Sequence, residues 1–217
     1  MTLESIMAEE QARKEKDNEV NSTYAKTLFK SLTGGEVVNK HVVDAKSGTV
    51  VHNPLFTELM RCESEYTKHY HMMGYHLKNA GDYFYLYDND VNIDDKQSSK
   101  TKIYAAIILL VRYITQEKRY LYDVLTDEHY GVSKEDLSGM MKDTQYSHIL
   151  ISSKLDNVDG MLKVLKQRQL VFELPSQKFI LSDAAKHIVE DVINQNSNLF
   201  ENFTSEKNEE NDDETAQ

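Results

Sequence analysis

The stretch from residue 156 to residue 183 constrains the fold of this chain most, because its hydrophobic period changes within a few residues. Up to Gln169, apolar side chains recur at helical spacing, with lysine and arginine off the apolar stripe. Residues 170–174 then read as a strand, residues 175–177 as a turn, and Phe179 and Leu181 as the returning strand. A helix that enters a tight β-hairpin is typical of the end of a winged-helix unit, so the stretch predicts a binding module.

A similar pattern lies 95 residues upstream, where the two segments align without a gap. Asn53 and Pro54 predict the start of a helix whose apolar spacing continues to residue 70. A turn at 80–82 then separates two short strands, and Phe84 falls on Phe179. We interpret the shared order as an internal duplication of two winged-helix units.

These patterns predict a mainly α fold with small β-hairpin wings, an α+β chain of tandem winged-helix domains. The expected divisions are a charged N-terminal extension (1–20), a first winged-helix domain (21–90), a linker (91–102), a second winged-helix domain (103–194) and an acidic C-terminal tail (195–217).

Several local boundaries follow from capping and composition. Ser22 is a candidate N-cap, Ser133 and Asp136 form a capping box, and Asp156 is expected to cap the second recognition helix. The apolar run 103–114, including Ile108, predicts a buried first helix of the second unit, followed by a helix near 120–125. Residues 143–153 are interpreted as a connector, and residues 184–193 as a closing helix.

Charge is concentrated at the two ends of the chain. The net charge is −11, of which residues 1–20 contribute −3 (six acidic, three basic) and residues 201–217 contribute −6 (seven acidic, one basic). The remaining −2 is spread over residues 21–200, so the body is nearly neutral and composition does not exclude nucleic acid as a partner. No apolar run is long enough to span a bilayer, and no secretory signal is recognised.

No pattern in the sequence predicts catalysis, a cofactor or a metal. Gly34 and Gly35 lack the Lys-Ser or Lys-Thr that a phosphate-binding loop requires. His69 and His71 are two residues apart on a predicted helix and therefore face different sides. Cys62 is the single cysteine, which excludes an internal disulfide, and we interpret it as a core residue rather than a nucleophile. The chain is therefore predicted not to be an enzyme.

Two groups of side chains are candidates for binding. The first is a set of tyrosines that suits a protein interface better than base stacking: Tyr66, Tyr70, Tyr83, Tyr85 and Tyr87. The second is a set of cations on or beside the second recognition helix and its wing: Lys154, Lys163, Lys166, Arg168 and Lys178. These cations suit weak, salt-dependent contacts with DNA phosphates, and the alternative is an ordinary solvated face.

The order of several stretches resembles the MukE/MksE family, the accessory subunits of bacterial condensins of the SMC type, and is closer to MksE. The matching stretches run from residue 24 to the C-terminus: Asn53–Phe56, Gly81–Leu86, Ile103–Ile114, Tyr122–Leu125, Leu162–Phe172 and Lys178–Ser182. The resemblance implies tandem winged helices, a homodimer, and binding to a kleisin subunit of the MukF/MksF type that bridges an SMC ATPase of the MukB/MksB type.

The resemblance also implies a cytoplasmic, nucleoid-associated protein with a role in chromosome condensation and segregation or in defence against plasmids. In the family, basic residues of the second unit contact DNA; Lys166 matches one of these sites, and Lys163 and Arg168 are its neighbours. The alternative reading from the residues is a free-standing winged-helix transcriptional regulator that binds DNA.

Overall fold

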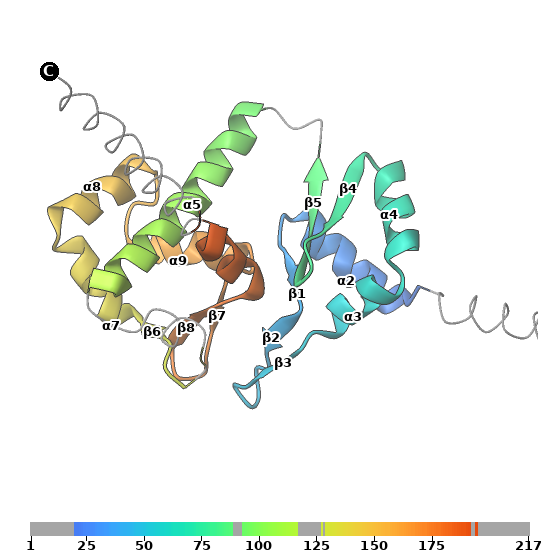
Figure 1. The fold of residues 1–217 in the computed structure, drawn as a ribbon, viewed down its shortest axis with the longest axis horizontal. Coiled ribbons are helices and arrows are strands. Elements are labelled where there is room, and N and C mark those ends of the chain that lie inside the picture. The colour runs from blue at the N-terminus through green and yellow to red at the C-terminus, as the bar shows by residue number, and fades with distance from the viewer. Residues whose placement is uncertain (1–19, 89–92, 117–126, 128, 192–193, 195–217) are drawn as a thin grey trace, which may run out of the picture.

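The computed structural model describes residues 20–88, 93–116, 127, 129–191 and 194, which form two units side by side (Figure 1). Each unit has its own hydrophobic cluster. The N-terminal cluster centres on Leu28, Leu59 and Phe84, and the C-terminal cluster on Leu137, Leu150 and Met161, all of which are fully buried.

The N-terminal unit packs three helices against one small sheet. The helices are α2 (Ser22–Thr33), α3 (Pro54–Arg61) and α4 (Glu63–Met72). The antiparallel sheet has the strand order β1 (Val38–Asn39), β5 (Tyr83–Asp88), β4 (Tyr75–Asn79). A separate two-stranded ribbon joins β2 (His41–Val43) to β3 (Val50–His52).

Capping residues set the helix limits in this unit. The side chain of Asn21, rather than the predicted Ser22, accepts hydrogen bonds from the backbone of Thr23 and Tyr24. Asn53 caps α3 and Pro54 occupies its first position, as predicted. The helical spacing of 55–70 is interrupted at Cys62, which ends α3 and precedes α4.

The C-terminal unit begins with the long helix α5 (Ile93–Gln116). It continues with β6 (Val132–Ser133), α7 (Lys134–Leu137), η1 (Ser138–Met141), α8 (Thr144–Ser152), α9 (Val158–Gln167), β7 (Val171–Glu173), β8 (Lys178–Leu181) and a closing helix over residues 183–191. The sheet order is β6-β8-β7. In both units, therefore, the last of the three sheet strands along the chain lies between the other two.

The two sheets share part of their register. Val38 pairs with Phe84 in the first sheet, and Val132 pairs with Phe179 in the second. The hairpin of the first unit closes with Asn79 opposite Phe84, and the hairpin of the second unit closes with Glu173 opposite Phe179. The turn of the second hairpin is therefore one residue longer than that of the first. The gapless alignment therefore holds for α4 against α9 and for the returning strand, and fails by one residue in β7.

Two segments predicted to be irregular are helical. The predicted linker (91–102) is largely the first part of α5, which begins at Ile93. Polarity suggested a linker, but this part contains no glycine or proline, the residues that most disfavour a helix. The predicted connector (143–153) contains α8, which buries Tyr146 and Leu150.

The N-cap of α9 also differs from its prediction. Asn157 accepts a hydrogen bond from the backbone of Gly160, whereas Asp156 precedes the cap with a φ of 58°. The capping box of Ser133 and Asp136 is present as predicted. The predictions for residues 1–19, for the helix near 120–125 and for the tail lie outside the described residues.

A polar seam joins the two units where β1 meets the end of α9. The Asn39 side chain is 2% exposed, donates from Nδ2 to the carbonyl of Gln169 (2.8 Å) and accepts at Oδ1 from the backbone of Ala184 (2.9 Å). Among the described residues, no buried side-chain nitrogen or oxygen lacks a hydrogen-bond partner. The seam therefore meets the requirement that buried polar groups be paired.

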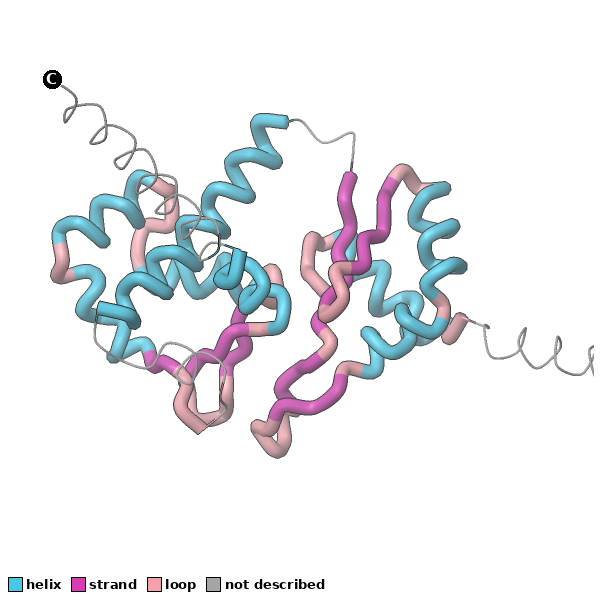
Figure 2. Tube along the Cα trace, in the orientation of Figure 1, coloured by secondary structure: helices cyan, strands magenta, loops and turns pink. Residues whose placement is uncertain are grey.

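Contacts on both sides of Asn39 extend the seam. The backbone N–H of Val37 donates to the carbonyl of Arg168, and the backbone N–H of His41 donates to Asp183 Oδ2 (2.8 Å). The β2–β3 ribbon also lies beside β7, so strands of both units come together at the bottom of the molecule (Figure 2). These contacts position β5 of the first unit opposite α5 and the closing helix of the second.

Candidate protein-binding groove

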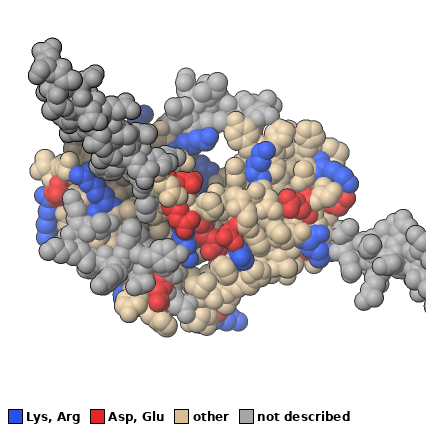
Figure 3. All heavy atoms as spheres, in the orientation of Figure 1, with Lys and Arg blue, Asp and Glu red and all other residues tan. Residues whose placement is uncertain are grey.

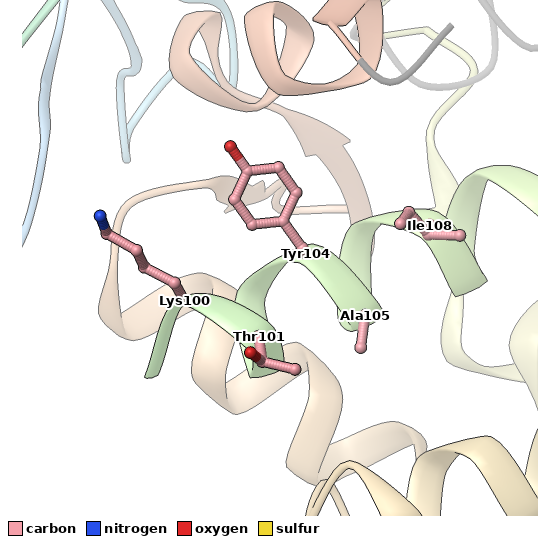
Figure 4. Close-up of a pocket in the computed structure, with 5 residues that line it drawn as sticks. All are labelled: Lys100, Thr101, Tyr104, Ala105 and Ile108. Atoms are coloured by element: carbon pink, nitrogen blue, oxygen red, sulfur yellow. The ribbon is translucent and has the colours of Figure 1, made fainter. Parts of the chain in front are cut away.

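An open groove of about 450 Å³ runs along α5 and is lined by Lys100, Thr101, Tyr104, Ala105 and Ile108 (Figure 4). Lys100, Tyr104 and Ile108 project from the same side of the helix, as their four-residue spacing requires. Tyr104 is 43% exposed and Ile108 is 42% exposed. The groove therefore presents apolar surface with one cation near it.

The opposite face of α5 packs into the C-terminal core and thereby fixes the position of the helix. Ala106, Ile107, Leu109, Leu110 and Ile114 are buried in the C-terminal core. The sequence prediction of a buried helix is therefore right for that face and wrong for Ile108. The sequence carried one sign of this exposed face: Tyr104 and Ile108 lie one helical turn apart and outside the stripe of buried residues.

The tyrosines of β5 lie beside this groove. The rings of Tyr83 and Tyr85 stack with centroids 5.9 Å apart, and Tyr83 meets His187 of the closing helix edge-on at 6.0 Å. The Lys100 ammonium lies 6.0 Å from the centroid of the Tyr87 ring. Thus β5, α5 and the closing helix converge, which brings Tyr83, Tyr85 and Tyr87 of the predicted interface set together.

The electrostatic surroundings of Tyr83 support this convergence. Burial raises the pKa of Tyr83, and the nearby Tyr85, Asp191 and Tyr104 raise it further. These neighbours belong to β5, the closing helix and α5, respectively. The phenol of Tyr83 is therefore neutral at physiological pH and suited to packing and hydrogen bonding with a partner.

The structure places Tyr66 and Tyr70 in the core rather than on the predicted interface. They are 3% and 2% exposed, and their rings stack with centroids 6.4 Å apart. The Tyr66 hydroxyl donates to Glu58, and burial raises the pKa of Tyr70 to about 12. Helical spacing places both residues on the inward face of α4, so they stabilise the N-terminal unit.

The predicted basic set is divided among different contacts. Lys166 forms an ion pair with Glu173 and lies near the Phe179 ring. Arg168 turns to the other unit and donates from Nη1 to the carbonyl of Gly35. Local sequence could not reveal this contact, because the two residues are far apart along the chain.

The other members of the set differ in exposure. Lys154 and Lys163 are exposed and Lys178 is half-buried. Figure 3 shows acidic side chains gathered near the boundary between the units on the face in view. Because acidic groups repel phosphate, that region does not suit a nucleic-acid backbone.

Within the part of the chain that the structure describes, no group of three His, Cys, Asp or Glu residues could hold a metal ion. Cys62 is 2% exposed, and burial raises the pKa of its thiol, which disfavours the reactive thiolate. No described helix has the length and apolar character needed to cross a membrane.

The comparison with protein families adds a match that spans both units. Residues 23–193 match the family model described as condensin complex protein MksE. The chain belongs to the MksE family. This finding confirms the resemblance read from the order of motifs, and a search of curated proteins finds no match.

Membership in the MksE family makes this chain a component of a multi-subunit condensin complex. It gives no support to the alternative of a free-standing transcriptional regulator. The match includes β5, α5 and residues 183–191, so the groove lies entirely within the part of the chain that the family shares.

Proposed function

We propose that this MksE-family chain is a non-catalytic accessory subunit that binds the kleisin subunit of its condensin complex in the groove along α5. The kleisin, of the MukF/MksF type, would link it to an SMC ATPase of the MukB/MksB type. The observation that supports this proposal is the exposed pair Tyr104 and Ile108, of which Tyr104 lies near Tyr83 of β5.

The proposal includes a tandem winged-helix architecture. In both units a helix precedes a short strand, further helices follow, and a hairpin closes the sheet. The same strand order in the two sheets supports this reading. In such an arrangement α4 and α9 correspond to the recognition helices and the hairpins to the wings.

The chemistry of the groove fits an extended peptide with apolar side chains. Covering the exposed parts of Tyr104 and Ile108 contributes about 1–3 kcal/mol for each well-packed side chain. Lys100 favours a carboxylate in the same peptide, and the tyrosine hydroxyls supply hydrogen bonds at the rim. An accessory subunit without a catalytic site can hold such a segment while the ATPase does the work.

The test is a binding measurement between the full chain and the kleisin-type subunit encoded in the same genome. Ile108→Asp is expected to lower affinity at least tenfold, because it places a charge in an apolar contact, and Tyr104→Ala several-fold. The matched controls are Ile151→Asp on α8 and Tyr130→Ala, at residues that are 64% and 57% exposed outside the groove. If the kleisin does not bind the native chain, or binds the groove variants as well as the controls, the proposal is wrong.

We further propose that the chain is a homodimer and that it contacts DNA weakly and without sequence specificity. The N-terminal unit leaves large apolar side chains exposed for self-association: Phe29, Met60, Met72 and Met73. Sedimentation at micromolar concentration is expected to give about twice the chain mass of 25.1 kDa. The work of the complex would be chromosome segregation or defence against plasmids, at the nucleoid in the cytoplasm.

A further inference from the structure

We propose that the C-terminal segment of the chain, residues 195–217, occupies the α5 groove when no partner is bound and must leave when the kleisin enters. The occupant is thus a named part of the same chain, held through Leu199, Phe200 and Phe203. Only the competition with the kleisin rests on the function proposed above. The docking of the segment does not.

The groove has the size and surface that call for an occupant. Its volume of about 450 Å³ lies in the range of binding pockets, roughly 300–1,000 Å³. Tyr104 and Ile108 would each remain more than two-fifths exposed without one. Because such paired apolar side chains mark interaction sites, a segment that covers them gains hydrophobic stabilisation.

The chain leaves the described structure next to this groove. The closing helix begins at Asp183, packs Ala184, Ala185 and Val189 into the same core as α5, and residue 194 is again helical. Its His187 contacts Tyr83, whose surroundings also include Asp191 and Tyr104. The end of the closing helix is therefore beside the tyrosines that border the groove.

The first apolar residues of the segment follow within reach. Leu199 is the fifth residue after Asn194, and five extended residues span roughly 17 Å. Within 195–217, the large apolar residues are Leu199, Phe200 and Phe203. The three-residue spacing of Phe200 and Phe203 allows both rings to contact neighbouring turns of α5, where Tyr104 and Ile108 are also one turn apart.

Charge is complementary between the segment and the end of the groove that Lys100 occupies. Residues 201–217 contain seven acidic residues and one basic residue, which gives a net charge of −6. Lys100 is the cation that lines this end of the groove. Attraction between these charges contributes to the binding free energy, and salt weakens this contribution. The contact of the aromatic rings with Tyr104 and Ile108 is less sensitive to salt.

Tethering allows a weak contact to be effective. A short flexible tether gives an effective concentration on the order of 1 mM, so a segment whose own Kd is about 0.1 mM occupies the groove about ten times more often than not. A partner that needs the free groove then binds about tenfold more weakly to the full chain than to a chain that ends at residue 194. The segment therefore acts as a built-in competitor.

Crosslinking in the full chain tests the docking without any partner. Cysteines are introduced by Ile108→Cys and Phe203→Cys, and the native Cys62 is too buried to compete. Under mild oxidant, the intrachain disulfide is expected to form at least tenfold faster than in the control pair Ile151→Cys with Phe203→Cys, because a disulfide needs Cα atoms within about 7 Å. Adding Phe200→Ala slows the reaction, whereas adding Thr204→Ala does not.

The outcomes separate this inference from the proposed function. Equal rates in the two cysteine pairs overturn the docking, and so does a product with the mass of two chains, which places the segment on another copy. If the disulfide forms quickly but neither the full chain nor residues 1–194 bind the kleisin, the docking stands and the proposed function fails. If both forms bind the kleisin equally, the competition between segment and kleisin is wrong.

Discussion

The guanidinium of Arg168 occupies the space that a side chain at Gly35 would need. Its Nη1 donates to the Gly35 carbonyl at 2.8 Å, and a Cβ on Gly35 would lie 1.6 Å from that nitrogen. Gly35 also has a φ of 79°, which L-residues with a side chain adopt at a cost. The absence of a side chain at Gly35 thus permits the contact between the two units.

Gly35→Ala is expected to destabilise the protein more than a glycine substitution of equal backbone strain. Gly74 provides that comparison, because its φ is 84° and a Cβ at this position would meet no atom within 4 Å. We expect Gly74→Ala to cost about 1 kcal/mol and Gly35→Ala about 1–3 kcal/mol more, measured by urea unfolding. In an Arg168→Ala background the extra cost should vanish; if it persists, the clash with Arg168 is not its cause.

Asn39→Ala tests the buried centre of the seam. The substitution leaves the Gln169 carbonyl and the Ala184 N–H without their partner, and an unpaired buried polar group costs about 1–3 kcal/mol. Chemical denaturation should show the loss, and hydrogen exchange should increase at Ala184. Asn79→Ala, at an exposed residue, is the control; an equal loss there would contradict a special role for Asn39.

Alkaline pH is expected to destabilise the protein through Tyr70. Burial raises the pKa of Tyr70 from about 10 to about 12, so the folded state retains a proton that the unfolded state loses. The stabilisation is complete below pH 10 and is lost as pH rises to about 12, a change of about 2–3 kcal/mol. Unfolding measured from pH 9 to pH 12 should show a shallower decline in Tyr70→Phe. An unchanged decline would place the titration elsewhere.

The double substitution Lys163→Glu with Lys166→Glu tests the proposed DNA contact. Loss of two phosphate contacts is expected to weaken binding to a mixed-sequence duplex and to reduce the slope of log K against log salt by about 2. Lys154→Glu is expected to have a smaller effect, because it removes one charge. Unchanged affinity and slope in the double variant would mean that the exposed Lys163 and the Glu173-paired Lys166 are ordinary surface cations.

Local patterns predicted most of the elements, and they failed where a helix carried polar residues. The change of period after Gln169 indicated α9, which ends at Gln167, and its hairpin; the capping box of Ser133 marked α7. The first ten residues of α5 looked like a linker, because their polar composition gave no apolar stripe to detect. α8 was missed because its short apolar run resembled a connector.

The candidate groove was only partly predictable. Alternation along β5 placed Tyr83, Tyr85 and Tyr87 on one strand. The helical spacing of Tyr66 and Tyr70 was the local signal that these two tyrosines face inward. Tyr104 and Ile108 stand on the face of α5 that the core does not cover, and only the packing of that helix reveals which face this is.

The amino-acid sequence by itself determined the helix-then-hairpin order of each unit, the acidic ends and the membership of the MksE family, because hydrophobic period, turn residues and motif order are properties of neighbouring residues. Only the tertiary structure decided that Arg168 reaches Gly35, that Asn39 joins the units, and that α5 leaves a groove open. These contacts join residues far apart along the chain, and long-range packing, not local pattern, sets their geometry.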